Sequence, residues 1–78
     1  MLSRYIHEAM ARACYKLLED ETYFGEIPGI TGVWSNELSL VKCREQLQEV
    51  LEEWLILKLR DHDPIPRIGR ASLGLKAA

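Results

Sequence analysis

The sequence contains very little cysteine and no long hydrophobic run. Its 78 residues include two cysteines, Cys14 and Cys43, which do not form a CxxC pair. We therefore predict no disulfide framework and expect two reduced thiols in a cytoplasmic protein. The longest apolar run, 54–57, has four residues, so we predict no membrane-spanning segment. The N-terminus also lacks the long apolar stretch of a signal peptide.

An excess of basic charge is missing as well. Ten basic and twelve acidic residues give a net charge of −2, so the chain has no overall positive field to attract a nucleic acid. Basic residues gather only loosely near the C-terminus, at Arg67, Arg70 and Lys76. No helix-turn-helix pattern is visible. The composition argues against direct binding to DNA or RNA.

Residues with the spacing of a catalytic or metal site are also scarce. The two histidines are His7 and His62. His62 lies in an Asp-His-Asp run, where adjacent side chains diverge and no second ligand cluster is available. The segment GEIPGITG has three glycines but neither a GxGxxG nor a GxxxxGK pattern. We predict a non-enzymatic protein without cofactor or metal, with a hydrolase acting through Asp or His as the alternative.

The hydrophobic pattern predicts a small α+β domain. A chain of this length forms one domain with a thin core. Apolar residues at helical spacing predict a helix over 2–11. Alternating and β-branched residues then predict strands near 14–18, 22–27 and 31–36, joined by a polar hairpin turn and a Pro-Gly corner.

The strongest pattern is a long amphipathic helix over 40–60. Its apolar residues are spaced three and four apart, at Leu40, Cys43, Leu47, Val50, Trp54 and Leu57. Ser39 is a suitable N-cap. Ile56 falls opposite this line, and Leu59 lies to one side of it. Either the C-terminal segment or another chain must cover them, so Ile56 and Leu59 are the candidate interface of a homo-oligomer.

The segment after this helix contains two prolines. Pro64 and Pro66 restrict 63–68 to an extended edge strand or a strap, because proline has no N–H for a ladder. The predicted fold is α+β: a small antiparallel three-stranded sheet with a short fourth edge strand, one long helix packed on one face and an N-terminal helix. The predicted divisions are an N-terminal helical extension, 1–12, a domain, 13–68, and a flexible tail, 69–78.

Several of these features together resemble a known family. They are Tyr23, Gly25, Ile27, Pro28 and Gly32, then the helix capped by Ser39, then Asp61 and Asp63 before Pro64 and Pro66. Over roughly 13–68 the chain resembles the HicB-like antitoxin family of the UPF0150 type, in a short form without a DNA-binding domain. His62 stands where members often have glycine, and a histidine would carry a modest strain there if the site requires a positive φ.

The resemblance implies a fold and a role. The fold is a partial ribonuclease-H-like domain without the carboxylates of a nuclease. The role is that of an antitoxin in a toxin–antitoxin system, which binds and neutralises a HicA-type ribonuclease toxin. The alternative is a solitary oligomeric adaptor or structural module of the same fold, without a toxin partner.

Strand alternation indicates where such a partner would bind. Phe24 and Glu26 alternate with the inward-facing Tyr23, Gly25 and Ile27, and Trp34 is expected on the same outer face as Phe24. Exposed aromatic residues on an open sheet are suitable interface anchors. Phe24, Glu26 and Trp34 are therefore the candidate partner-binding residues. In the alternative, the N-terminal helix covers Phe24 and Trp34.

Overall fold

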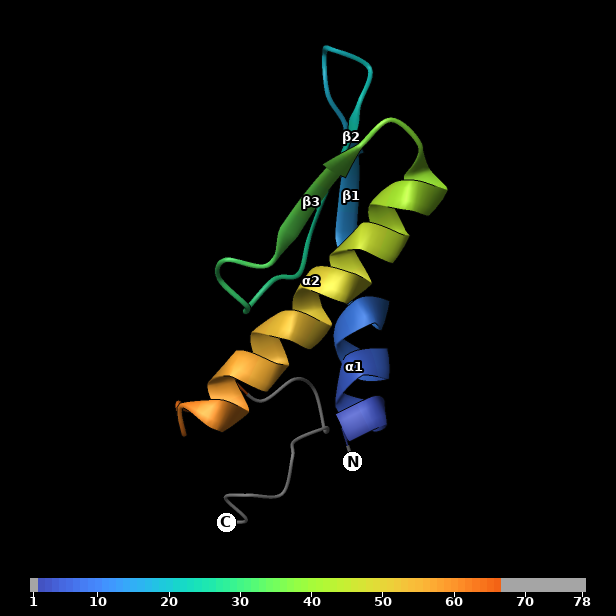
Figure 1. Ribbon diagram of the computed structural model, residues 1–78. Coiled ribbons are helices and arrows are strands. Elements are labelled where there is room, and N and C mark those ends of the chain that lie inside the picture. The colour runs from blue at the N-terminus through green and yellow to red at the C-terminus, as the bar shows by residue number, and fades with distance from the viewer. Residues whose placement is uncertain (1, 67–78) are drawn as a thin grey trace.

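The computed structural model describes residues 2–66, and Figure 1 shows their arrangement. The predicted order of a helix, three strands and a long helix is confirmed, and the domain is α+β. The elements are α1 (Leu2–Ala11), β1 (Cys14–Leu17), β2 (Tyr23–Glu26), β3 (Trp34–Glu37) and α2 (Leu40–Arg60).

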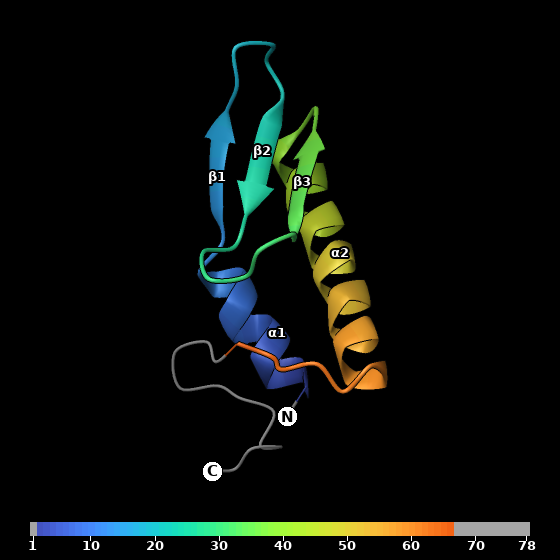
Figure 2. The ribbon, with the colours of Figure 1, turned by 90° about the vertical axis from the view of Figure 1, so that its left-hand side faces the viewer.

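The three strands form an antiparallel sheet in the order β1-β2-β3. Its register aligns Tyr15 with Gly25 and Gly25 with Ser35. Helix α2 packs on one face of the sheet, along β2 and β3. Helix α1 lies beyond the end of the sheet, where it packs against α2 rather than on the strands (Figure 2).

The turn between β1 and β2 matches the predicted polar hairpin. The Leu18 N–H donates to the Thr22 carbonyl oxygen over 2.8 Å, and Glu21, with φ 67°, occupies the left-handed position of the turn. The Asp20 carboxylate accepts hydrogen bonds from the Thr22 hydroxyl and N–H. These bonds lower the pKa of the Asp20 carboxyl below its usual value.

The Pro-Gly corner between β2 and β3 contributes to the core as well as changing the chain direction. The Ile30 N–H donates to the Ile27 carbonyl oxygen over 3.1 Å, and Gly29 has φ 91°. These features define a type II turn, which requires positive φ at its third residue. Ile27, Ile30 and Val33 are all buried and belong to the main apolar cluster.

The buried line along α2 differs from the predicted one. It follows Cys43, Leu47, Leu51 and Leu55, whereas Trp54 is only half-buried and Leu57 is 47% exposed. Residues four apart form a row that inclines around a helix. Two elements cover this row, because the sheet packs on α2 along β2 and β3 and α1 packs on it as well. The predicted inward position of Leu57 is wrong.

The predicted fourth edge strand does not form in 63–66, the part of it that the structure describes. Residues 63–66 are irregular, and residues 67 and 68, like the predicted tail 69–78, lie outside the described residues. Instead, the Tyr5 hydroxyl donates to the Pro66 carbonyl oxygen, and Ile65 packs against the core cluster. This segment crosses α1 in Figure 2 and acts as the strap that the prolines allowed. Burial raises the pKa of Tyr5 to about 12, so its hydroxyl remains a donor.

Both ends of α2 are capped. The Ser39 hydroxyl accepts a hydrogen bond from the Lys42 N–H over 3.1 Å, as predicted. At the other end, the Asp63 N–H donates to the Lys58 carbonyl oxygen over 2.9 Å, and His62 has φ 57°. This pattern is a Schellman motif, in which the residue after the cap is usually glycine. His62 therefore occupies a left-handed position in which a residue other than glycine carries a modest strain.

His62→Gly is expected to stabilise the protein by about 0.5–1 kcal/mol, because glycine adopts this left-handed conformation without a Cβ penalty. His62→Ala keeps the penalty and serves as the matched control, with no gain expected. Equilibrium urea unfolding would measure both. Equal gains from glycine and alanine would show that loss of the imidazole, rather than relief of the backbone, stabilises the protein.

Candidate functional site

The face of the sheet that points away from α2 carries the candidate partner-binding residues. The register places Cys14 beside Glu26 and Glu26 beside Trp34, and it aligns Lys16, Phe24 and Asn36 in a second row. Side chains of directly opposed residues project from the same face of a sheet. We call this surface the open face. It consists of Cys14, Lys16, Phe24, Glu26, Trp34 and Asn36.

An aromatic pair joins β2 and the edge strand β3 on the open face. The rings of Phe24 and Trp34 stack with their centroids 6.0 Å apart and an angle of 24° between their planes. Trp34 is 56% exposed and Phe24 is half-buried. Helix α1 directs Tyr5 and Ala9 into the core and packs on α2, so it leaves Trp34 uncovered. The alternative in which α1 covers both aromatic residues is wrong.

One charge of each sign flanks the aromatic pair. Lys16 lies beside Phe24 on the neighbouring strand, and Glu26 lies beside Trp34. Both charged side chains are exposed, and neither forms an ion pair with another of the described residues. Asn36 donates hydrogen bonds to the Thr22 hydroxyl over 2.8 Å and to the Tyr23 carbonyl oxygen over 3.0 Å. These bonds fix the rim of the open face next to Phe24.

The reverse side of the sheet attaches the open face firmly to α2. Ser35 is buried, and its hydroxyl donates to the Cys43 carbonyl oxygen over 2.8 Å. The Cys43 thiol donates to the Tyr23 carbonyl oxygen over 3.4 Å. Gly25 lies in the same layer, under the ring of Tyr15. The aromatic pair therefore rests on a rigid support, which lowers the entropy lost when a partner binds.

The two candidate oligomer residues lie on α2 and are placed differently. Ile56 is 59% exposed, as its position opposite the predicted apolar line implied. Leu59 is half-buried. The described part of the C-terminal segment leaves Ile56 exposed.

The histidines and possible metal ligands considered in the sequence do not come together in the structure. His7 lies in the groove between α1 and α2, and His62 lies at the C-terminal cap of α2. Within residues 2–66, no three His, Cys, Asp or Glu residues come together as a metal-binding group. None of the helices in this part of the chain is long and apolar enough to cross a membrane.

Sequence reasoning found the aromatic residues of the open face but missed their neighbours. Lys16, Asn36 and Cys14 join this surface through cross-strand register, which depends on where the Asp20 turn places β1 against β2. The alternation within 14–17 already placed Cys14 and Lys16 on one face. Only their pairing with Glu26 and Phe24 required the structure.

Comparison with known proteins places the chain in a family. The UPF0150-like family matches residues 4–66, so the chain belongs to it. The predicted resemblance to HicB-like domains of the UPF0150 type is thereby confirmed. The matched stretch includes most of α1 together with the sheet and α2.

A solved structure supports the same fold. The chain is 47% identical to the TTHA0281 protein from Thermus thermophilus, whose crystal structure superimposes with a TM-score of 0.84. The match covers 88% of this chain and 86% of that one. No curated protein matches this chain.

Proposed function

We propose that this chain is a non-catalytic, cytoplasmic HicB-like antitoxin domain that binds and neutralises a HicA-type ribonuclease toxin by protein–protein contact. The open face would be the contact surface, with Phe24, Glu26 and Trp34 as binding residues. The observation that carries the proposal is the Phe24–Trp34 stack, which leaves Trp34 56% exposed on a sheet face that no described element covers.

The physical support comes from the chemistry of protein interfaces. Tryptophan is strongly enriched among residues that dominate binding energy, because it removes a large apolar area from water at little cost in side-chain entropy. Trp34 already has its ring orientation constrained by Phe24. Lys16 and Glu26 would steer and orient the partner from the rim, where charges affect association more than affinity.

Co-expression with a HicA-type ribonuclease encoded in a neighbouring reading frame tests the proposal. The wild-type chain is expected to co-purify with the ribonuclease and to relieve its toxicity. Trp34→Ala is expected to lose both effects, and Ile56→Ala, an exposed apolar change on α2, should retain both. If the wild-type chain recovers no such ribonuclease and relieves no toxicity, the toxin-binding role fails. The adaptor alternative would then account better for the open face.

A further inference from the structure

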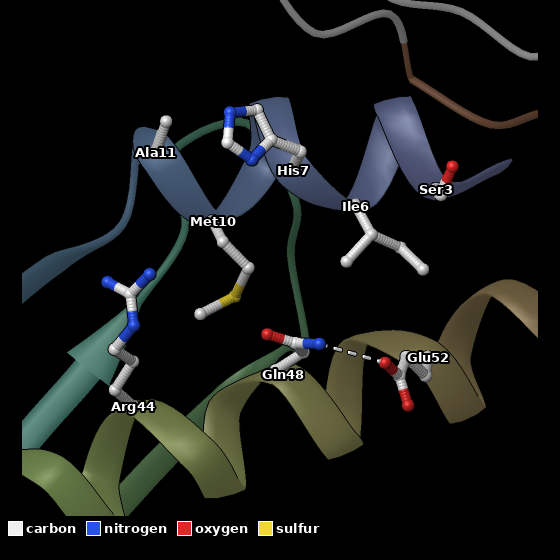
Figure 3. A pocket seen from close by; sticks show the side chains of 8 residues that line it. All are labelled: Ser3, Ile6, His7, Met10, Ala11, Arg44, Gln48 and Glu52. Atoms are coloured by element: carbon white, nitrogen blue, oxygen red, sulfur yellow. Dashed lines mark hydrogen bonds between the residues drawn. The ribbon is translucent and has the colours of Figure 1, made fainter. Parts of the chain in front are cut away.

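Helix α1 is joined to α2 by apolar contacts. A groove of about 320 Å³ lies between the two helices, and Figure 3 shows Ile6 and Met10 projecting from α1 toward α2. In the α2 wall of this groove, the Gln48 amide donates to the Glu52 carboxylate of its own helix over 3.1 Å. Within residues 2–66, no hydrogen bond or ion pair joins α1 to α2. Polar contacts between the two helices therefore do not fix the position of α1.

The strap, residues 63–66, supplies the polar contact that α1 lacks on α2. Tyr5 is 0% exposed, and its hydroxyl donates to the Pro66 carbonyl oxygen. Ile65 packs against the core cluster, so the strap is itself attached to the domain. Figure 2 shows the strap crossing α1. Helix α1 is therefore held both by α2 and by the strap.

Helix α1 depends on these contacts for its own structure. It has ten residues, and isolated helices shorter than about 12–15 residues are marginal in water. No acidic residue lies in its first turn and no basic residue lies in its last turn, so terminal charges do not favour its dipole. Its inward-facing residues, Tyr5, Ala9 and Met10, all belong to the core cluster. A helix of this kind should unfold once it leaves the core.

We infer that α1 and the strap form a latch, which opens as one cooperative unit while the sheet and the first half of α2 stay folded. The Tyr5–Pro66 hydrogen bond closes the latch, because it joins α1 directly to the strap. Proteins open locally where few contacts join a segment to the rest of the domain. In the described part of the chain, this bond is the only hydrogen bond from an α1 side chain to another segment. Its loss should therefore free α1 and the strap together.

Opening the latch changes the core but leaves the open face in place. Leu51 and Leu55 are 0% exposed and share the core cluster with the inward-facing residues of α1, so departure of α1 uncovers part of their surface. The sheet keeps its own attachment to α2, because the Ser35 hydroxyl donates to the Cys43 carbonyl oxygen. The latch therefore conceals an apolar surface of α2 without taking part in the proposed toxin contact.

Native-state hydrogen exchange of the full chain, followed by NMR, tests the latch. In the wild type, the α1 amides should exchange at least about 10-fold faster than the slowest amides of β2 and α2. Tyr5→Phe removes only the hydroxyl and should speed the α1 amides by roughly 3- to 10-fold, the effect of losing one hydrogen bond. The β2 amides should keep their rates.

Tyr23→Phe is the matched control for this substitution. Tyr23 accepts hydrogen bonds at its carbonyl oxygen, and within residues 2–66 its hydroxyl forms none. Removing that hydroxyl should therefore leave the exchange of α1 unchanged.

A substitution in the strap tests whether the two parts of the latch open together. Ile65→Ala removes the contact between the strap and the core cluster and does not alter α1. Because the strap holds α1, this variant should also speed exchange of the α1 amides, again without changing the β2 amides.

Three results would overturn the inference. They are α1 amides that exchange as slowly as those of β2, a Tyr5→Phe variant in which every element exchanges faster by the same factor, and an Ile65→Ala variant with unchanged exchange of α1. The inference goes beyond the proposed toxin binding, and the exchange measurement requires no partner. Trp34→Ala, which tests the toxin contact, should leave the exchange of α1 unchanged.

Discussion

Leu51→Ala is expected to destabilise the protein by about 2–5 kcal/mol, the range for removing a fully buried leucine side chain. Leu51 is 0% exposed and belongs to the cluster that joins α1, α2 and the Pro-Gly corner. A chain of 78 residues has a total stability of roughly 4–12 kcal/mol. The variant should therefore lose a large share of its stability, which equilibrium urea unfolding followed by circular dichroism would measure.

Ile56→Ala is the matched control for this experiment. It removes a similar apolar side chain from the same helix, but at a position that is 59% exposed. Its expected cost is within about 0.5 kcal/mol, as for most surface substitutions. Equal losses at positions 51 and 56 would show that the buried face of α2 has been placed incorrectly.

Gly25→Ala is expected to destabilise the protein by about 1–3 kcal/mol through overpacking. A Cβ atom at Gly25 would lie 2.9 Å from two ring carbons of Tyr15 and 3.1 Å from the Cys43 sulfur. The layer between the sheet and α2 therefore has no room for a methyl group. In a domain of this size each kcal/mol lowers the melting temperature by roughly 4–8 °C, so thermal unfolding would detect the change.

Two further variants show whether crowding causes this loss. Glu26→Ala changes the adjacent residue on the exposed side of β2 and should leave the melting temperature nearly unchanged. In a Tyr15→Ala background, Gly25→Ala should cost less than it does in the wild type, because the ring it meets has been removed. Fully additive effects of the two substitutions would contradict the crowding account.

The parts of the fold that sequence predicted well depend on local chemistry. Helix α2 begins and ends where Ser39 and the Asp61–Pro64 segment indicated, because caps and prolines act on their immediate neighbours. The alternation of Phe24 and Gly25 likewise placed the aromatic residue on the outer face. These inferences required no knowledge of distant contacts.

The parts that sequence predicted poorly depend on contacts between distant residues. Leu57 lies on the predicted apolar line, but the packing of α1 against α2 favours burial of Leu51 and Leu55 instead. The segment 63–66 became a strap because the Tyr5 hydroxyl binds the Pro66 carbonyl, a contact between the two ends of the described chain. Arg44, Gln48 and Glu52 line a groove that exists only because α1 packs beside α2.

The central claim is that the open face binds a ribonuclease partner through Trp34. The most direct test is titration of a HicA-type ribonuclease with the wild-type chain, Trp34→Ala and the control Ile56→Ala, with RNA cleavage as the readout. Trp34→Ala should inhibit at least about 30-fold more weakly than the wild type, equivalent to about 2 kcal/mol, while its fold remains intact. Ile56→Ala should inhibit like the wild type. Equal inhibition by Trp34→Ala and the wild type would contradict the claim.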